Sequence, residues 1–431
     1  MLLHQPSKPY FIKLIKLAAP IIVGQLGIVL VSFVDTFMVG HYGVKELAAA
    51  SFVNNVTMIL IVAGLGFAMG LSPLVSDAVG RGDIHKAGAL LKAGLKTNGI
   101  LAAIVGFILL GLYLNLDKMG QPAELMPLIK DYFIIVSFSI LTTFFFNTFK
   151  QFTDGTLNTT VSMVIVITSN LINIVGNYLL IYGKYGFPEM GLMGAGISTL
   201  IARLYTIVAM VGYFLYSKKM AGFRQGFTAS HNSSTHMKEI TKLGTPVCLQ
   251  MTLESTSFSL IIIMVGWLGA NALATHQVMA TISQLCFTFY IAVGNAASIL
   301  ISNLNGKGMK QAVLTTAKAG YGIILLITFI SNGFIILNFD NLVSFFTNSS
   351  EVKVLASILL VPFMLYQVGD GLQIFFSNAL RGIQRVKPIL PIAFIAYIII
   401  SIPASYVFGF IFGLGLKGIW FGYPISLTFA G

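Results

Sequence analysis

Apolar residues occur along this chain in long runs separated by short polar segments. A helix of about 20 apolar residues is long enough to cross the hydrocarbon core of a bilayer. The pattern therefore predicts twelve transmembrane helices. We place them near residues 11–37, 47–75, 93–115, 128–149, 161–182, 191–216, 240–266, 272–302, 313–338, 352–380, 388–411 and 415–431.

The composition agrees with this pattern. Of the 431 residues, 56% are hydrophobic and 9% are charged, whereas about a quarter of the residues in a soluble domain are charged. The predicted fold class is therefore an all-α integral membrane protein. The lipid bilayer is one of its expected partners.

The two halves of the chain repeat each other at a spacing of 226 residues. Glycine, proline and basic positions match as well as apolar ones, which chance similarity among apolar helices would not produce. The matching segments are 17–20 with 243–246, 38–40 with 264–266, and 80–82 with 306–308.

Six helices in each half is an even number, so both halves enter the membrane from the same side. Such a parallel repeat is found in secondary transporters. We expect two six-helix bundles around a central cleft: an N-lobe over 1–218 (helices 1–6), a cytoplasmic linker over 219–239, and a C-lobe over 240–431 (helices 7–12). The repeat would place the end of the second half near residue 444, so we expect the last helix to be cut short.

The net charge of +12 could suggest nucleic acid, but the positions of the charges argue against it. With loops assigned alternately to two sides, nineteen Lys and Arg residues fall on the side of the N-terminus and six on the other, while Arg203 lies within a helix. This is the positive-inside pattern. We expect a multi-pass protein of the bacterial inner (plasma) membrane with a cytoplasmic N-terminus, and no nucleic-acid partner.

Three of the fourteen acidic residues fall inside predicted helices: Asp35, Glu254 and Asp370. An ionised carboxylate at the centre of a bilayer costs about 3 kcal/mol or more. These residues should therefore face the bundle interior or a water-filled cavity. Under the 226-residue shift Asp35 corresponds to Ile261 and Glu254 to Ile28, so each half has its own polar cluster with its own duty.

Polar residues one helical turn away accompany these acids. Gln250 precedes Glu254 by four residues, Tyr366 precedes Asp370 by four, and Asn173 and Asn177 form such a pair in the fifth helix. Carboxylate, amide and phenol oxygens suit a small hard cation, and a carboxylate alone suits a proton. The alternative is that these residues make helix–helix hydrogen bonds that only stabilise the bundle.

At this point the residues resemble a known family. The spacing from Pro20 to "VDTFMVG", the "GRGD" loop at 80–83 and "NLINIVGNYLLIYG" in the fifth helix resemble the multidrug and toxic compound extrusion (MATE) transporters. "LESTSF" at 253–258, "YQVGDGLQ" at 366–373 and "LRG" at 380–382 point to the NorM-like branch. The DinF-like branch has an aspartate at the position of Asn177, and this chain departs from that pattern.

The resemblance implies two ion sites and no cofactor. Glu254, Asp370 and Tyr366 would form a C-lobe site for the coupling ion, with Na+ as a candidate ligand of the two carboxylates. Asp35, Asn173 and Asn177 would form an N-lobe site for an ion or a proton, and we add Thr199 on the following helix as a companion of Asp35.

Three further residues complete the assignment. We place Gln250 and Gln284 in the substrate cavity. Pro20 removes one backbone hydrogen bond and offers a bend in the helix of Asp35, so we assign it as a hinge.

The function predicted from these features is secondary active efflux of organic cations in exchange for Na+ or H+, by a protein that we expect to be monomeric. A lipid-precursor flippase is the alternative, although a pyrophosphate would call for basic residues in the cavity and only Arg203 lies within a helix. An aspartyl protease is excluded because Gln367 stands where Gly-x-Gly-Asp needs its first glycine. No Walker sequence occurs, so we expect neither an enzyme nor ATP as the energy source.

Overall fold

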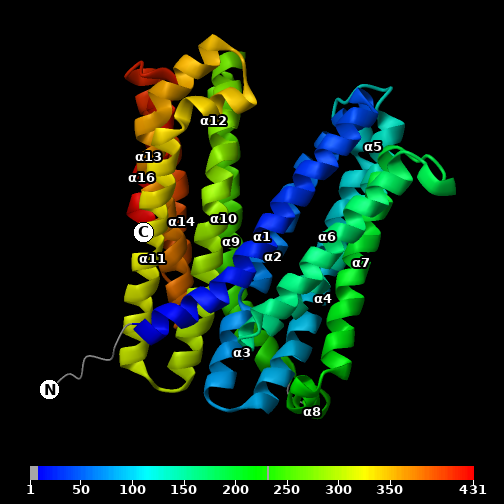
Figure 1. Ribbon diagram of the computed structural model, residues 1–431, viewed down its shortest axis with the longest axis vertical. Helices are drawn as coiled ribbons and strands as arrows, with labels where there is room; N and C mark the ends of the chain where they lie inside the picture. Colours follow the sequence, from blue (N-terminus) through cyan, green and yellow to red (C-terminus); the bar gives the residue numbers. More distant parts are fainter. Residues whose placement is uncertain (1–7, 231–232) are drawn as a thin grey trace. The chain divides into compact units, whose positions relative to one another are not determined.

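The computed structural model describes residues 8–230 and 233–431 of the chain. These residues form helices joined by short connections, and none of them lies in a strand (Figure 1). The predicted all-α membrane fold is therefore confirmed.

The first half of the chain contains eight α-helices and three short 3₁₀ turns, at 116–118, 184–186 and 218–220. The α-helices are α1 (Lys8–Tyr42), α2 (Val44–Ala68), α3 (Leu71–Gly80), α4 (Ile84–Leu114), α5 (Met126–Gly155), α6 (Thr159–Ile181), α7 (Leu192–Tyr216) and α8 (Ala221–Ala229).

The second half begins with α9, whose described start is Ser233. Its helices are α9 (Ser233–Gly266), α10 (Ala270–Gly306), α11 (Lys310–Leu337), α12 (Phe339–Phe346), α13 (Ser350–Gly382), α14 (Ile389–Phe394), α15 (Ile402–Tyr406) and α16 (Gly415–Ala430). Two π-helical segments, η4 (Ile395–Ser401) and η5 (Val407–Ile411), continue α14 and α15, so that 389–411 is a single span.

Eleven of the helical spans in the described residues are long and apolar enough to cross a membrane. They correspond to the first eleven predicted helices, with α2 and α3 together forming one span. The twelfth predicted helix corresponds to α16, which has 16 residues here.

The chain forms two compact units. The N-unit is Val23–Cys248, and the C-unit combines Met1–Ile22, described from Lys8, with Leu249–Gly431. The boundaries after Ile22 and after Cys248 are 226 residues apart, which is the period of the repeat. Each boundary falls inside a long helix, α1 or α9, two residues after a proline, Pro20 or Pro246. The lobes predicted from the sequence end in the polar segment instead, and their functional meaning stays a prediction.

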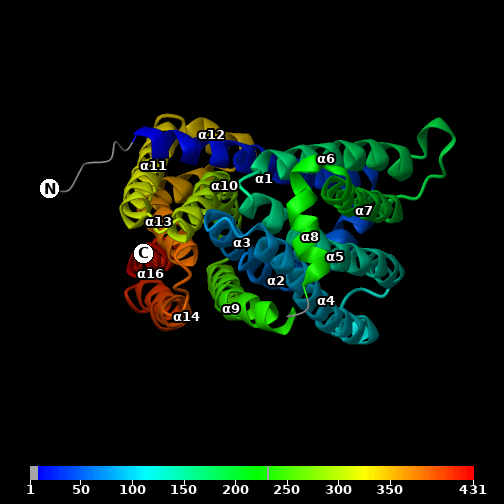
Figure 2. The ribbon, with the colours of Figure 1, turned by 90° about the horizontal axis from the view of Figure 1, so that it is seen from below.

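Close backbone approaches explain two departures from the sequence prediction in the N-unit. The helix expected over 47–75 is interrupted between α2 and α3, where a Cβ on Gly70 would lie 2.7 Å from the backbone nitrogen of Gly244. The polar segment expected as a linker contains α8, which packs on α4 (Figure 2). A Cβ on Gly88 would lie 2.0 Å from the carbonyl oxygen of Phe223, so this packing requires glycine.

Aromatic and aliphatic side chains from α2, α4 and α5 form the core of the N-unit. Phe144 packs so closely on α2 that a Cβ on Gly64 would lie 2.4 Å from its ring. In the C-unit, α13 packs against both α10 and α16. This close packing fixes the positions of helices that carry or adjoin the polar residues of the candidate site.

Candidate functional site

Asp35 of α1 is held by amides of α6. Asn177 Nδ2 donates to Asp35 Oδ1 and also to Asn173 Oδ1 at 3.4 Å. Asn173 Nδ2 in turn donates to Thr199 Oγ1 of α7 at 3.1 Å. The structure thus brings all four predicted N-lobe residues into one hydrogen-bonded chain across three helices, which we call the Asp35 site.

Small residues allow these three helices to come close. A Cβ on Gly27 of α1 would lie 2.7 Å from Asn170 Nδ2 of α6, and one on Gly176 would lie 2.4 Å from Ser198 Oγ of α7. Ser198 Oγ donates to the carbonyl oxygen of Asn173 at 2.7 Å. The asparagines are fully buried because of this packing, with Asn177 0% exposed.

Two further residues act on the Asp35 site without having been assigned to it from the sequence. The charge of Arg203, on α7, acts on Asp35 and on Tyr132 of α5. Arg203 follows Thr199 by four residues and therefore lies on the same face of α7. Its presence inside an apolar helix was a signal in the sequence, whereas nothing in the sequence singled out Tyr132 among sixteen tyrosines.

In the C-unit, Glu254 of α9 and Asp370 of α13 are electrostatic neighbours. Asp370 is 1% exposed, and its Oδ2 has no hydrogen-bond partner among the described residues. Tyr366, one turn before Asp370, interacts with both acids. The structure therefore brings the three predicted C-lobe residues together, in what we call the carboxylate-pair site.

Tyr397 completes the carboxylate-pair site, and sequence reasoning missed it. It is 0% exposed and interacts with Glu254, Asp370 and Tyr366. Ser257 Oγ donates to the Tyr397 carbonyl oxygen at 3.0 Å and fixes η4 against α9. Because π-helical turns shift the register of a helix and are enriched at functional sites, periodicity could not have placed this residue.

Aromatic rings surround the carboxylate-pair site. Phe258 packs edge to face on Tyr397 and Tyr423, and Tyr366 packs on Trp420 and Tyr423. Buried like charges need a cation or a proton to be tolerated, and ring faces attract cations. Among the described residues no group of three His, Cys, Asp or Glu side chains occurs, so an ion here would rely on two carboxylates and on tyrosine hydroxyls.

The other predicted residues lie elsewhere. Gln250 is 6% exposed in the N-terminal part of the C-unit's α9, where its Nε2 donates to Ser377 Oγ at 3.3 Å. The side chain of Gln284, on α10, is exposed. Pro20 lies inside α1, two residues before the boundary between the compact units.

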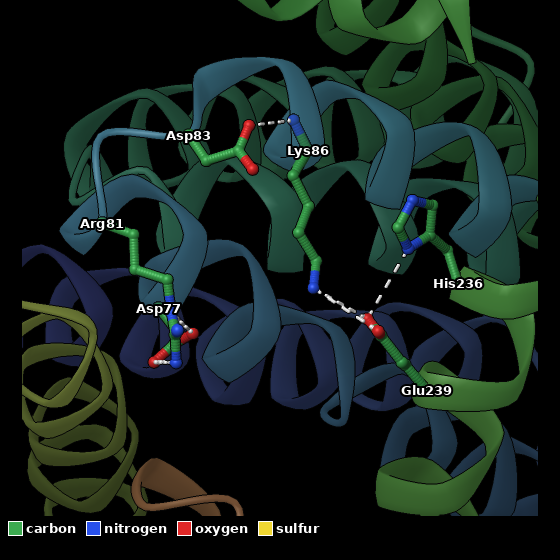
Figure 3. A network of polar contacts seen from close by, with 6 residues as sticks. All are labelled: Asp77, Arg81, Asp83, Lys86, His236 and Glu239. Atoms are coloured by element: carbon green, nitrogen blue, oxygen red, sulfur yellow. Dashed lines mark hydrogen bonds and ion pairs between the residues drawn. The ribbon is translucent and has the colours of Figure 1, made fainter. Parts of the chain in front are cut away.

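A separate group of polar contacts lies in the N-unit, around the ends of α3 and α4 and on α9 (Figure 3). Glu239 of α9 forms ion pairs with Lys86, at 3.3 Å, and with His236, at 3.6 Å. Asp83 Oδ1 caps α4 by accepting from the Lys86 backbone N–H at 2.8 Å. Asp77, 2.7 Å from Arg81, raises the pKa of that guanidinium. Only the Lys86–Glu239 pair joins two helices, and we assign these contacts a structural role.

A model of the MatE family matches residues 20–179 and 246–407. The chain belongs to the MatE family. The two matched segments begin at Pro20 and at Pro246, so the family model follows the repeat found in the sequence. The predicted membership of the multidrug and toxic compound extrusion transporters, and of their NorM-like branch, is confirmed.

Known MatE proteins resemble the chain over nearly its whole length. "Multidrug resistance protein NorM" of Vibrio parahaemolyticus serotype O3:K6 is 29% identical over 426 residues, which cover 97% of this chain and 92% of that protein. The crystal structure of a Vibrio cholerae MATE transporter, VcmN, has a TM-score of 0.88 at 18% identity and covers 98% of this chain and 95% of its own.

A third similar protein shows why the fold does not decide the function. A MOP superfamily transporter from Pyrococcus furiosus has a TM-score of 0.86 at 21% identity and covers 100% of this chain and 94% of its own. It is described as having a binding pocket of reversed polarity that suggests a different function. The charges within the fold therefore have to be considered for each chain.

Proposed function

We propose that this protein is a secondary active multidrug efflux antiporter that exports organic cations in exchange for Na+ or H+. The observation that carries the proposal is the carboxylate-pair site. Two carboxylates are electrostatic neighbours of each other and of tyrosine hydroxyls, within a cluster of aromatic rings in membrane-spanning helices. The relationship to NorM supports export of several compounds as the function.

In this mechanism Glu254, Asp370 and Tyr366 bind the coupling ion, and Tyr397 adds a fourth oxygen. The entry of a cation or a proton removes buried negative charge. That change can bias two conformations only if they solvate the carboxylates differently. A few kcal/mol of difference shifts such a balance by about a hundredfold.

Asp35 is the second switchable group in the proposal. Protonated Asp35 would release the chain of hydrogen bonds that runs through Asn177 and Asn173 to Thr199. A bend at Pro20, in the same helix as Asp35, would accommodate the movement of that helix. The protein would work as a monomer in the bacterial inner membrane, with a cytoplasmic N-terminus and with the repeat halves 1–218 and 240–431 as its two lobes.

Accumulation of a cationic dye tests this function. Energised cells that contain the protein should accumulate less ethidium than cells without it, and an uncoupler should abolish the difference. Inside-out vesicles with and without an imposed Na+ gradient would then separate Na+ from H+ coupling. Equal dye accumulation in cells with and without correctly inserted protein would rule out the antiporter.

A further inference from the structure

The helix α13 has a polar face that runs from the carboxylate-pair site to the C-terminal end of the helix. Its members follow one another every three or four residues and therefore share one side of α13: Asp370, Gln373, Ser377 and Arg381. The first and the last are about 16 Å apart along the helix axis. Three of the four are buried and Ser377 is partly buried, so this face lies almost entirely inside the protein.

Polar residues of α9 lie beside this face. Gln250 Nε2 donates to Ser377 Oγ at 3.3 Å. One turn further along α9, Glu254 is the electrostatic neighbour of Asp370. The two helices therefore bring polar groups together at successive levels, and the row of polar side chains continues from the two carboxylates to Arg381.

Arg381 ends this row with a buried positive charge. Its Nη2 donates to Asn378 Oδ1 and, at 3.4 Å, to Asn295 Oδ1 of α10, while its Nε has no hydrogen-bond partner among the described residues. None of the ion pairs in the described part of the chain includes this arginine. Neutral amide oxygens and the carbonyl end of α13 hold the guanidinium in place, but no acid cancels its charge.

The N-unit contains the same helix crossing. A Cβ on Gly155 of α5 would lie 2.8 Å from the carbonyl oxygen of Ser72 in α3. A Cβ on Gly382 of α13 would lie 2.9 Å from the carbonyl oxygen of Ser298 in α10. Ser72 and Ser298 are one repeat period apart, so the residue before each glycine has the same place in its own unit.

The charge at this place is balanced in the N-unit and unbalanced in the C-unit. Asp154, which corresponds to Arg381, forms an ion pair with Lys150 at 2.8 Å. Phe146 corresponds to Gln373 and interrupts the polar face of α5. The arginine without a counter-charge therefore occurs in the unit where a continuous polar face leads to a pair of acids.

We propose that Arg381 is an electrostatic barrier that prevents the coupling cation from leaking between the carboxylate-pair site and the C-terminal end of α13. This inference rests on the proposed antiport, in which every ion that crosses has to be coupled to export. A cation or a proton that followed the polar face would have to pass a guanidinium, and this group cannot lose its charge by deprotonation in a protein. An arginine that lines a pore excludes cations and protons by the same repulsion.

Passive ion flux in the absence of any exported compound tests the barrier. Proteoliposomes that contain the purified protein would be given a K+ diffusion potential with valinomycin. Internal pyranine fluorescence and ²²Na+ uptake would then measure the leak of protons and of sodium. We expect Arg381→Gln to leak at least about tenfold faster than the wild type, because a unit charge beside the route is removed. Arg381→Lys keeps the charge and should be as tight as the wild type.

Two further variants locate the leak. Adding Asp370→Asn to Arg381→Gln should return the flux to the wild-type level, because the route then no longer begins at an ion held by two carboxylates. Arg385→Gln is the matched control, since Arg385 is an exposed arginine just beyond the end of α13. That variant removes the same charge from outside the polar face and should not leak.

Asn295→Asp removes the net charge while the arginine stays in place. Asn295 Oδ1 already accepts from Arg381 Nη2, so a carboxylate at this position would form an ion pair with the guanidinium. We expect this variant to leak like Arg381→Gln. An effect of packing around the arginine would be seen in Arg381→Gln and not here.

Three results would overturn the inference. The first is a folded Arg381→Gln protein, judged by monodisperse elution, that leaks no faster than the wild type. The second is a leak that persists in full when Asp370→Asn is added, and the third is an equal leak in Arg385→Gln. If Arg381→Gln does not fold, a folded Asn295→Asp protein with the wild-type leak overturns the inference instead. A tight wild type that exports no dye would refute the proposed function alone, because the leak assay contains no exported compound.

Discussion

The Asp35 site and the carboxylate-pair site neutralise buried negative charge in different ways. Asp35 accepts a hydrogen bond from the amide of Asn177 on α6. Asp370 has a second carboxylate as its electrostatic neighbour, together with Tyr366 on its own helix and Tyr397 on η4. One acid has a hydrogen-bond donor from a neighbouring helix, whereas the other has a second acid as its charged neighbour.

The repeat makes this difference instructive. The backbone of the two halves follows one 226-residue period, and yet neither Asp35 nor Glu254 has an acidic counterpart in the other half. Duplication has therefore supplied two similar scaffolds, and substitution has given them different chemistry.

Removing the carboxylate-pair site should have the largest effect. In Asp370→Asn the pair loses one charge and one anionic oxygen ligand, while the shape of the side chain is kept. We expect ion-driven dye export in vesicles to fall to the level of vesicles without the protein. Asp340→Asn is the matched control, because Asp340 is an exposed acid in α12 of the same unit. Sodium-dependent export by Asp370→Asn would leave Glu254 or Asp35 as the coupling group.

Replacement of Asp35 by asparagine should uncouple the protein without unfolding it. The amide can still bond to Asn177, but the side chain at position 35 is fixed in a neutral form. We expect export to drop by at least about tenfold, which corresponds to about 1.4 kcal/mol of lost bias, with an unchanged elution profile. Normal ion-dependent efflux would reduce Asp35 to a helix–helix contact.

The packing of α8 on α4 is a second difference between the two units. Gly88 lies under Phe223, whereas Leu314, at the equivalent repeat position of α11, is 57% exposed. Gly88→Ala should therefore destabilise the N-unit by about 1–3 kcal/mol through overpacking. A thermal-unfolding scan in detergent measures the change.

Gly111→Ala is its control on the same helix, since a Cβ there would have no neighbour within 4 Å. That variant should melt at or slightly above the wild-type temperature, because alanine favours a helix over glycine by about 1 kcal/mol. Equal destabilisation in both variants would show that the packing of α8 is not the cause.

The smallest effect is expected at Glu239, in the network of Figure 3. Lys86 and Glu239 have side chains 37% and 33% exposed, so water screens their ion pair. Glu239→Gln should cost no more than about 1 kcal/mol and should leave the stoichiometry of Na+ binding unchanged. A loss of Na+ binding in this variant would contradict the separation of this network from the carboxylate-pair site.

The sequence predicted the features for which the membrane environment penalises the wrong type of residue. Eleven spans were visible because lipid demands long apolar helices, and three acids were visible because lipid excludes them. Asn173 and Asn177 followed from their spacing on a helix. Thr199 followed from its place on the next helix, and the structure joins it to Asn173.

The remaining parts depend on tertiary contacts. Tyr132 and Tyr397 could not be selected, because a tyrosine costs little in an apolar helix and many are present. The helix α8 was missed because nine residues give too short a pattern to separate from a polar loop. Gln284 was expected in the cavity from its polarity alone; its side chain is exposed, and its place in a substrate cavity stays a prediction.

The boundary within α1 has a consequence for biosynthesis. Residues up to Ile22 belong to the C-unit, and Leu14 lies against Gly320 of α11, where a Cβ would meet its side chain at 3.3 Å. Roughly 300 residues separate these partners, and at about 5–20 residues per second the ribosome needs roughly 15–60 seconds to make them. The amino-terminal half of α1 is therefore made well before the helix on which it packs. Until then this half has to be sheltered by lipid or by the insertion machinery.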